Sequence, residues 1–167
     1  MTADTEFTPG PDHARSLRDA LGRFATGVTV VTTHGPHGPV GLTANSFAAV
    51  SLDPALVLWS PAKTSRRFGA FAHARFFAVH VLAEDQMDLC RHFTQADNHF
   101  AGLDMTTSPE GTPLIGGTLA RFECATEATH DAGDHLIIIG RVLRACYRDG
   151  APLIFSRGRY GGFQTLP

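Results

Sequence analysis

The sequence predicts a mainly β protein with short helices, folded as a closed or nearly closed antiparallel barrel. Three observations lead to this prediction: six or seven short extended runs, glycine and proline turns between them, and no G-x-G-x-x-G motif. A doubly wound α/β fold would require regular alternation of strands and helices, which the sequence lacks. Closure of an antiparallel sheet is favoured because it removes exposed sheet edges.

Length and composition indicate one globular domain. The chain has 167 residues, 43% of them hydrophobic and 18% charged, and a formal net charge of −2. We expect residues 1–15, which are polar and contain Pro9, Gly10 and Pro11, to form a flexible arm, and residues 16–167 to form the domain. No basic block indicates a nucleic-acid partner, and no apolar run approaches the roughly 20 residues of a membrane span.

The cysteines and histidines favour no metal site. Cys90, Cys124 and Cys146 are odd in number, far apart and in no C-x-x-C arrangement, which argues against a disulfide framework or structural zinc. We interpret them as reduced thiols of a cytoplasmic protein, buried as small hydrophobes. The arm has no apolar signal-peptide core. His34 and His37 flank glycine and proline, an unfavourable setting for a metal pair.

The N-terminal third contains a helix followed by a hairpin. Ser16 and Asp19 resemble a capping box that begins the helix, and Gly27 ends it. Apolar residues recur at the spacing of one helical face: Leu17, Ala20, Leu21 and Phe24. Residues 28–33 are rich in β-branched side chains, residues 34–39 form a glycine and proline turn, and residues 40–51 are a second extended run. This pattern predicts an antiparallel hairpin.

The middle of the chain alternates short strands and short helices. Asp53-Pro54 interrupts the extended pattern, and residues 55–59 form a third strand. We expect Thr64 to cap a short helix that carries Phe68 and Phe71 on one face. A strand over residues 76–82, a helix over 84–93 and a glycine- and proline-rich loop over 98–113 follow.

The C-terminal third is predicted to be almost entirely strand. Residues 119–126 alternate weakly, and residues 131–134 form a turn. The long strand 135–147 follows, then the turn 148–150 and a last short strand over 153–155.

Two polar stretches could hold a ligand. Hydroxyls and an amide lie on adjoining strands at Thr43, Asn45, Ser46 and Ser51. The second stretch, at a predicted strand-to-helix junction, comprises Ser60, Lys63, Thr64, Ser65, Arg66 and Arg67. A helix N-terminus with arginines and hydroxyls suits a phosphate. The alternative is a capped helix with solvated basic residues.

Two histidines allow a functional and a structural interpretation. His135 follows Gly133-Asp134 at the start of a long strand, where it could hydrogen-bond a ligand or move a proton. The alternative is a turn with a surface histidine. His80 alternates with apolar residues in its strand, which favours a hydrogen-bonded, partly buried histidine.

Taken in order, these segments resemble the flavin reductase-like family, which has the FMN-binding split-barrel fold. The matching stretches cover roughly residues 16–163 and comprise 24–32, 41–47, 50–54, 63–65, 76–82, 133–135 and 158–160. The resemblance implies an NAD(P)H-dependent flavin reductase that passes a hydride from NADH or NADPH to FMN or FAD. It also implies a homodimer, and a partner monooxygenase that receives the reduced flavin.

The resemblance also assigns site residues by position. The stretch along the isoalloxazine ring and ribityl chain is Thr43, Ala44, Asn45 and Ser46. The phosphate segment comprises Ser60, Lys63, Thr64, Ser65, Arg66 and Arg67, with Ser65 and Arg66 the strongest candidates. Phe93 belongs to the helix region that covers the flavin, and Arg159 and Tyr160 close the site. His135 lies near the nicotinamide as the catalytic residue, a positioning group first and a proton donor second.

Two departures and two alternatives accompany this assignment. Trp59 stands where smaller residues are common, and Arg66-Arg67 replaces the usual small hydroxyl residue, which could favour a diphosphate and hence FAD. One alternative function is a non-catalytic flavin module that carries electrons or senses redox state. The other is an oxidase of the pyridoxamine phosphate type, against which Gly133-Asp134-His135 and the Thr-Ala-Asn-Ser stretch argue.

Overall fold

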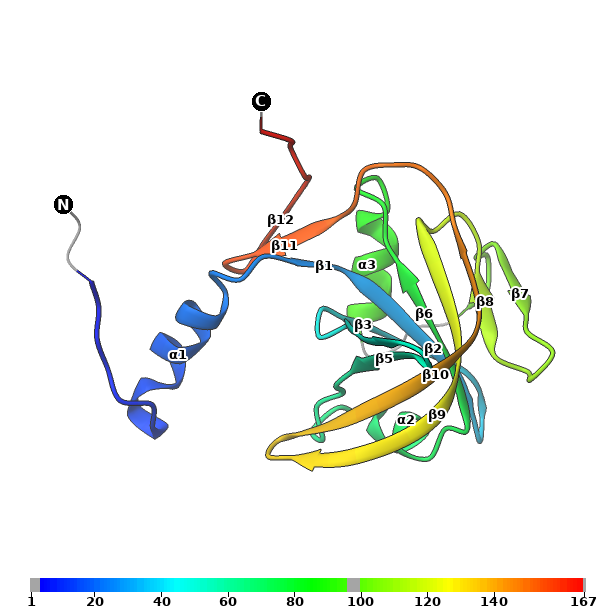
Figure 1. Ribbon diagram of the computed structural model, residues 1–167, viewed down its shortest axis with the longest axis horizontal. Coiled ribbons are helices and arrows are strands. Elements are labelled where there is room, and N and C mark those ends of the chain that lie inside the picture. Colours follow the sequence, from blue (N-terminus) through cyan, green and yellow to red (C-terminus); the bar gives the residue numbers. More distant parts are fainter. Residues whose placement is uncertain (1–3, 96–99, 167) are drawn as a thin grey trace.

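A seven-stranded antiparallel sheet forms the body of the protein. Figure 1 shows the computed structural model, which describes residues 4–95 and 100–166. The strands of this sheet are β2 (Thr29–Gly35), β3 (Gly38–Ala44), β4 (Ala48–Leu52), β5 (Ala55–Trp59), β6 (Phe76–Val81), β9 (Ala120–Ala132) and β10 (His135–Tyr147). Their spatial order is β3-β2-β6-β9-β10-β5-β4. Over the described chain the edge strands β3 and β4 do not pair with each other, so the sheet is not the closed barrel that was one of the predicted forms.

Smaller elements cover the body. β1 (Thr26–Gly27), β11 (Ile154–Ser156) and β12 (Arg159–Gly161) form one small sheet, and β7 (Met105–Thr107) and β8 (Pro113–Ile115) form another. The helices are η1 (Pro11–His13), α1 (Ala14–Leu21), α2 (Phe68–Ala72) and α3 (Met87–Thr94). Residues 98 and 99 of the predicted loop lie outside the described residues, and β7 and β8 lie within or next to the remainder of that loop.

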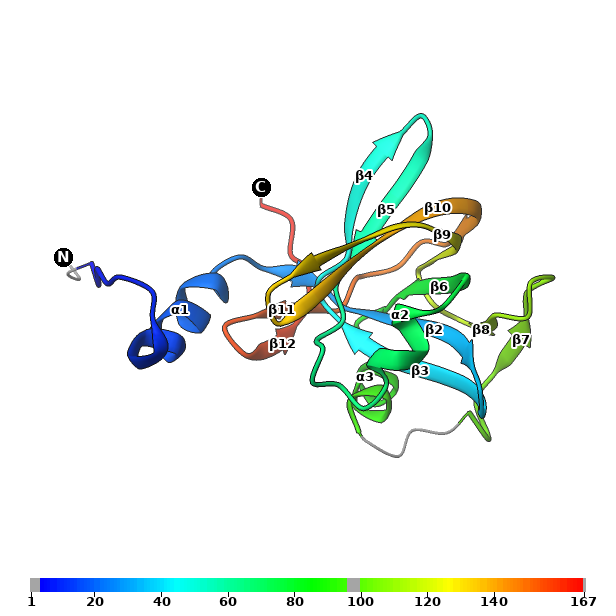
Figure 2. The ribbon, with the colours of Figure 1, turned by 90° about the horizontal axis from the view of Figure 1, so that it is seen from below.

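The sheet curls around its inner apolar face. Buried side chains from β2, β5, β6, β9, β10 and helix α2 form one cluster: Val31, Val57, Trp59, Phe71, Phe77, Val79, Cys124 and Ile138. Strands that are not neighbours, such as β2 and β5, meet in this cluster only because the sheet bends, as Figures 1 and 2 show. Trp59 is 0% exposed and packs edge-on against Phe71, with ring centroids 4.9 Å apart. Its bulk therefore fills the core.

A second cluster lies on the opposite face of β2. It joins β2 to α3, β8 and the segment before β11: Val28, Val30, Leu82, Cys90, Phe93, Ile115 and Leu153. Successive side chains of a strand point to opposite faces, so a strand covered on both sides is buried at almost every position. This accounts for the continuous burial of residues 29–33 in β2.

Helix α1 lies apart from the body, and its boundaries differ from the prediction. It begins at Ala14, so Ser16 lies inside the helix and the predicted capping box is wrong. It ends at Leu21, before the predicted Gly27. No residue of α1 is buried, and Leu21 and the following Phe24 are 67% and 80% exposed. Figure 1 shows the helix projecting away from the sheet.

Some other element boundaries also differ from those that the sequence pattern predicts. The run 40–51 divides into β3 and β4, because residues 45–47 leave the ladder and turn the chain. Thr64 does not cap a helix: α2 begins only at Phe68, and residues 63–67 are turns. In contrast, the hairpin of β2 and β3 and the whole of β10 are confirmed. Figure 2 shows β4 and β5 projecting as a hairpin.

The three thiols are free, and they differ in exposure. Cys90 and Cys124 are buried, as predicted. Cys146 is exposed, because the last residues of β10 extend beyond the core. Every helix in residues 4–95 and 100–166 falls short of the length and hydrophobicity that a bilayer span requires.

His80 joins three strands inside the protein. Its side chain is 0% exposed, more deeply buried than predicted. Nδ1 donates to the Val30 carbonyl at 3.0 Å, and Nε2 accepts from the Ile115 N–H at 3.1 Å. This arrangement fits only the neutral ring, since a proton on Nε2 would face a donor. Burial, together with the charge of Arg121, lowers the pKa of His80 to about 4.

We predict that His80 makes stability depend on pH below neutrality. Between pH 6.5 and about 4 the unfolded chain binds a proton that the folded chain excludes, so stability falls as the pH drops through this window. The loss is on the order of 3 kcal/mol by pH 4. Urea unfolding from pH 7 to 4 should show a steeper decline for wild type than for His80→Gln. The exposed-site variant His130→Gln should retain the wild-type slope, and equal slopes in all three proteins would refute the assignment.

Candidate functional site

The first polar stretch lies where β3 ends and the chain turns toward β4. Thr43 Oγ1 donates to the Cys90 carbonyl at 2.8 Å, which fixes the end of β3 against α3. Ser46 Oγ accepts a hydrogen bond of 2.9 Å from the Ser60 N–H. The second polar stretch begins at Ser60, so the two predicted stretches are joined directly.

The loop of residues 60–67 is held by the turn between β9 and β10. Lys63 Nζ forms an ion pair with Asp131 and donates to the Gly133 carbonyl at 2.6 Å. The Lys63 N–H donates to the Asp134 carbonyl at 2.9 Å. The hydrogen bond from Lys63 lowers the pKa of the Asp131 carboxyl. Lys63 therefore anchors the loop, and its ammonium is already paired.

Within this loop, some hydrogen-bond donors are used by the fold, and others are available to a ligand. Arg67 Nη1 donates to the Phe93 carbonyl at 3.0 Å, and the Arg67 N–H donates to Ser65 Oγ at 3.3 Å. Thr64 and Arg66 are exposed, and their side chains make no hydrogen bond or ion pair with the described part of the chain. Arg66, the Thr64 hydroxyl and the Ser65 proton are thus the donors that a phosphate could meet.

His135 lies beside this loop, at the first position of β10. It bridges to Ala62, which places it next to Lys63. Nδ1 donates to the Asp134 carboxylate at 2.7 Å, and the His135 side chain is 42% exposed. The hydrogen bond with His135 lowers the pKa of Asp134. Because Nδ1 is occupied, Nε2 is the nitrogen that remains for a ligand.

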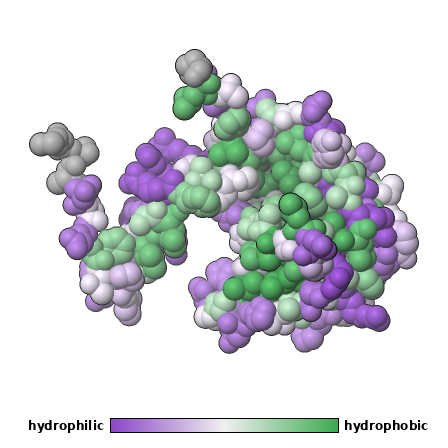
Figure 3. Space-filling model, in the orientation of Figure 1, coloured by the Kyte–Doolittle hydropathy of each residue, from purple (hydrophilic) through white to green (hydrophobic). Residues whose placement is uncertain are grey.

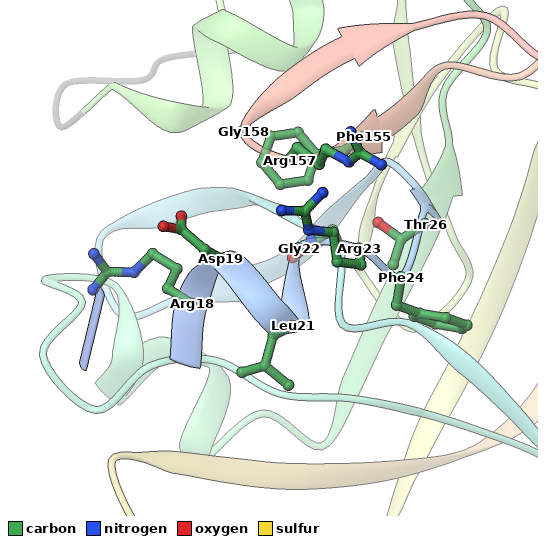
Figure 4. A pocket seen from close by; sticks show the side chains of 11 residues that line it. Arg18, Asp19, Leu21, Gly22, Arg23, Phe24, Thr26, Phe155, Arg157 and Gly158 are labelled. Carbon is green, nitrogen blue, oxygen red and sulfur yellow. The ribbon is translucent and has the colours of Figure 1, made fainter. Parts of the chain in front are cut away.

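An open cleft of about 130 Å³ lies at the end of β3. Its walls are Val28, Thr43, Ala44, Asn45, Thr94, Phe155 and Tyr160. Burial, and then the hydrogen bond with Cys90, raises the pKa of Tyr160 to about 12, so the phenol stays protonated. A second pocket, of about 390 Å³, adjoins the cleft and shares Asn45 and Phe155 with it (Figure 4). Figure 3 shows the molecule hollowed between α1 and the body.

The sequence matches the family model of the flavin reductase like domain over residues 21–164. The chain belongs to this family. The match spans every element from the end of α1 to β12, and therefore both polar stretches and His135.

Relatives of this flavin reductase-like chain carry related names. An FMN reductase (NADH), SmoA, of Agrobacterium fabrum is 59% identical over 98% of this chain and 94% of its own. The reductase subunit HsaB of a flavin-dependent monooxygenase from Rhodococcus jostii is 46% identical over 100% of this chain and 88% of its own. A solved structure of the Streptomyces globisporus NADH:FAD oxidoreductase SgcE6 in complex with NAD and FAD fragments has a TM-score of 0.87, at 38% identity. The matched region spans 95% of this chain and 98% of the SgcE6 chain.

Most residues predicted for the flavin reductase site come together, with two exceptions. Phe93 is 0% exposed and packs in the second core cluster, so its ring supports β3 from behind and does not face the cleft. Arg159 is exposed on β12 and is not part of the wall of either pocket. Tyr160, its neighbour, does line the cleft.

Sequence reasoning missed several residues that line the two pockets. They are Arg18, Arg23, Thr26, Thr94, Phe155 and Arg157. Arg157-Gly158 is a hairpin turn in which both residues have positive φ, 50° and 73°. A basic residue followed by glycine between two short apolar runs could have indicated this hairpin.

We predict that Gly41→Ala disturbs the site by displacing the Phe93 ring, which supports β3 from behind. A Cβ at Gly41 would lie 2.3 Å from Phe93 Cε1, and the Phe93 ring is enclosed by α3. The ring and α3 must shift, which costs roughly 1–3 kcal/mol and moves the Thr43 contact to Cys90. Thermal unfolding and flavin titration should both reveal the defect. Gly27→Ala, where a Cβ meets nothing within 4 Å, is the matched control. A Gly41→Ala protein as stable as this control would contradict the packing argument.

Proposed function

We propose that the chain is an NADH-dependent flavin reductase that supplies reduced FMN or FAD to a partner monooxygenase. The observation that carries the proposal is one connected site: the end of β3, the loop 60–67 and His135, joined by hydrogen bonds between Ser46 and Ser60 and around Lys63. The family match covers all three parts. The names of SmoA and HsaB support the donor and the partner class.

The residues present fit a flavin. An amphipathic ring needs an open face with a few polar groups, which the cleft at Ala44, Asn45 and Tyr160 offers. A phosphate needs unpaired donors, and Arg66, Ser65 and the Thr64 hydroxyl provide them at the neighbouring loop. Bound FMN or FAD would accept a hydride from the nicotinamide. FAD is accommodated as readily as FMN by this donor set.

The protein's contribution to hydride transfer is placement. Hydride passes between two rings only when they are held in contact and aligned, and it requires no strong acid or base. Asp134 fixes the tautomer of His135 with the proton on Nδ1, so Nε2 can accept a hydrogen bond from a carboxamide. We assign His135 to orientation of the nicotinamide.

A homodimer is the second part of the proposal. The cleft of about 130 Å³ is smaller than the roughly 300–1,000 Å³ of typical ligand pockets, so one chain supplies only part of the enclosure. Large apolar side chains are left uncovered on α1 and on the β4–β5 hairpin, where Leu52 is 95% exposed. Isologous pairing is the commonest solution for small proteins. Light scattering that shows an active monomer would contradict this part.

Two further assignments complete the proposal. The curled sheet with unpaired edges β3 and β4 matches a split barrel, in which the open side meets a second chain. A cytoplasmic location suits the three free thiols, since reducing compartments keep thiols unpaired.

We predict that the purified chain oxidises NADH only when free flavin is added. NADH oxidation should rise with FMN or FAD and saturate, and flavin fluorescence should be quenched on titration at tens of micromolar. Arg66→Ala should weaken flavin binding about tenfold by removing one charge-assisted contact, whereas Arg75→Ala, outside the site, should not. NADH oxidation equal to that of free flavin alone, with no fluorescence change, would exclude the proposed function.

We predict a kinetic role for His135. His135→Ala should lower kcat/KM for NADH by about tenfold to a hundredfold, or roughly 1.4–2.8 kcal/mol of transition-state stabilisation. Flavin affinity and melting temperature should change little, because the side chain is 42% exposed and contributes little to core packing. Stopped-flow measurement of flavin reduction tests this, with His130→Ala, exposed on the adjacent strand, as the control. Reduction rates within twofold of wild type would remove His135 from the site.

A further inference from the structure

A pocket of about 390 Å³ lies between the end of α1 and the β11–β12 hairpin. Arg18, Arg23 and Arg157 line it, together with Phe24, Thr26 and Phe155. In Figure 4, Arg23 and Arg157 project beside Phe155, and Arg18 and Asp19 come from α1. Asp19 is the acidic residue in its wall, against three arginines. The pocket is therefore cationic and partly aromatic.

The cations of this pocket are not used by the fold. Over residues 4–95 and 100–166, the guanidinium groups of Arg18, Arg23 and Arg157 form no ion pair and no hydrogen bond. Thr26, in the same wall, has a buried Oγ1 that lacks a hydrogen-bond partner there. Three guanidinium groups that the fold leaves without a partner among the described residues, in the wall of one pocket, indicate an anionic ligand that accepts hydrogen bonds.

The hairpin that carries Arg157 is fixed in a costly conformation. Arg157 has φ 50°, a left-handed conformation that a side chain disfavours by roughly 1–2 kcal/mol. The Arg157 N–H donates to the Gly22 carbonyl at 2.9 Å, and Ser156 Oγ donates to the same carbonyl at 3.3 Å. These bonds hold the Arg157 backbone against the end of α1, beside Arg23. Strain of this kind is typical of functional sites.

The pocket is continuous with the flavin cleft and separate from the phosphate loop. It shares Asn45 and Phe155 with the cleft, and no described residue of the loop 60–67 lines it. A flavin anchored by Ser65 and Arg66 would have its phosphate at that loop. The second group of unpaired cations then remains for the other phosphate-bearing molecule of the reaction.

We propose that this pocket binds the adenosine diphosphate portion of the nicotinamide donor and so gives the enzyme its preference for a complete dinucleotide. The inference rests on the proposed function. Guanidinium forks bind diphosphate oxygens bidentately, and the exposed Phe24 ring and the half-buried Phe155 ring, both in the pocket wall, offer aromatic surface on which adenine can stack. Because Asn45 lines both this pocket and the flavin cleft, the adenosine diphosphate portion would lie next to the flavin ring that receives the hydride.

The test uses two probes that divide the donor into its parts. ADP-ribose, which lacks the nicotinamide, is titrated into the full chain by calorimetry. Flavin reduction is then measured with NADH and with N-benzyl dihydronicotinamide, which lacks the diphosphate and the adenosine. The variants are Arg23→Gln, Arg157→Asn and the double substitution. Asparagine tolerates positive φ, so Arg157→Asn removes the charge and keeps the turn.

The expected result is a loss confined to the dinucleotide. The double variant should bind ADP-ribose about tenfold to a hundredfold more weakly and lose a similar factor in kcat/KM for NADH. Its kcat/KM for the benzyl donor and its dissociation constants for FMN and FAD should stay within about twofold of wild type. Arg15→Gln removes an arginine of α1 that does not line the pocket and should resemble wild type throughout.

Several outcomes would overturn the inference while leaving the proposed function intact. The first is ADP-ribose binding that is absent in wild type or unchanged in the double variant. The second is an equal loss of kcat/KM with NADH and with the benzyl donor. Weakened FAD binding with normal NADH kinetics would assign the pocket to FAD and also overturn it. If wild type reduces flavin with neither donor, the proposed function fails. The inference is then decided by calorimetry: binding lost in the double variant supports it, and no binding in wild type overturns it.

Discussion

The inner face of the sheet must bury Trp59, Phe71 and Phe77 against β2, and the rest of the molecule depends on that packing. Trp59 comes from β5, which is three strands away from β6 in the sheet order, and Phe71 comes from α2, so these rings meet only when the sheet bends. Bending brings the start of the loop after β5 close to the end of β3, where Ser60 and Ser46 form their hydrogen bond. The three rings therefore position the polar residues, and none of the three lines the cleft itself.

The proposed flavin side and the proposed donor side of the site are built differently. On the flavin side, the loop 60–67 is fixed by main-chain bonds to β10 and by Lys63, and the long β9–β10 pair supports it. On the proposed donor side, α1 and the β11–β12 hairpin touch each other through Gly22, and within the described residues the guanidinium groups of Arg18 and Arg157 are unpaired.

The sequence was informative where a residue's role depends on its neighbours in the chain. Strand β10 was predicted with its observed bounds, because a Gly-Asp turn and an apolar run define it locally. The family resemblance assigned His135 to the nicotinamide, whereas its place beside the loop 60–67 follows from its bridge to Ala62. Phe93 was assigned to the flavin because it lies on the correct helix. Its inward orientation depends on the absence of a side chain at Gly41, which is distant in sequence.

Contacts between distant segments explain the other errors. Arg157 is far in sequence from Arg18 and Arg23, the other arginines of the second pocket, and the pairing of β1 with β11 brings Arg23 and Arg157 together. The predicted cap at Thr64 failed because Lys63 is pinned to the Asp131–Asp134 turn, so the helix starts one turn later. Neither tertiary contact leaves a periodic signal in the sequence.

The small sheet of β1, β11 and β12 has a consequence for how the site opens. Its strands have two or three residues each, and none of their residues is buried, whereas β9 and β10 have thirteen residues each. Segments with so few buried contacts exchange their amide hydrogens through local opening, while core strands exchange only on global unfolding. Detachment of the hairpin from Gly22 would therefore release one wall of the cleft at low free-energy cost. The barrier to product escape would then be set by this local equilibrium, independently of the stability of the core.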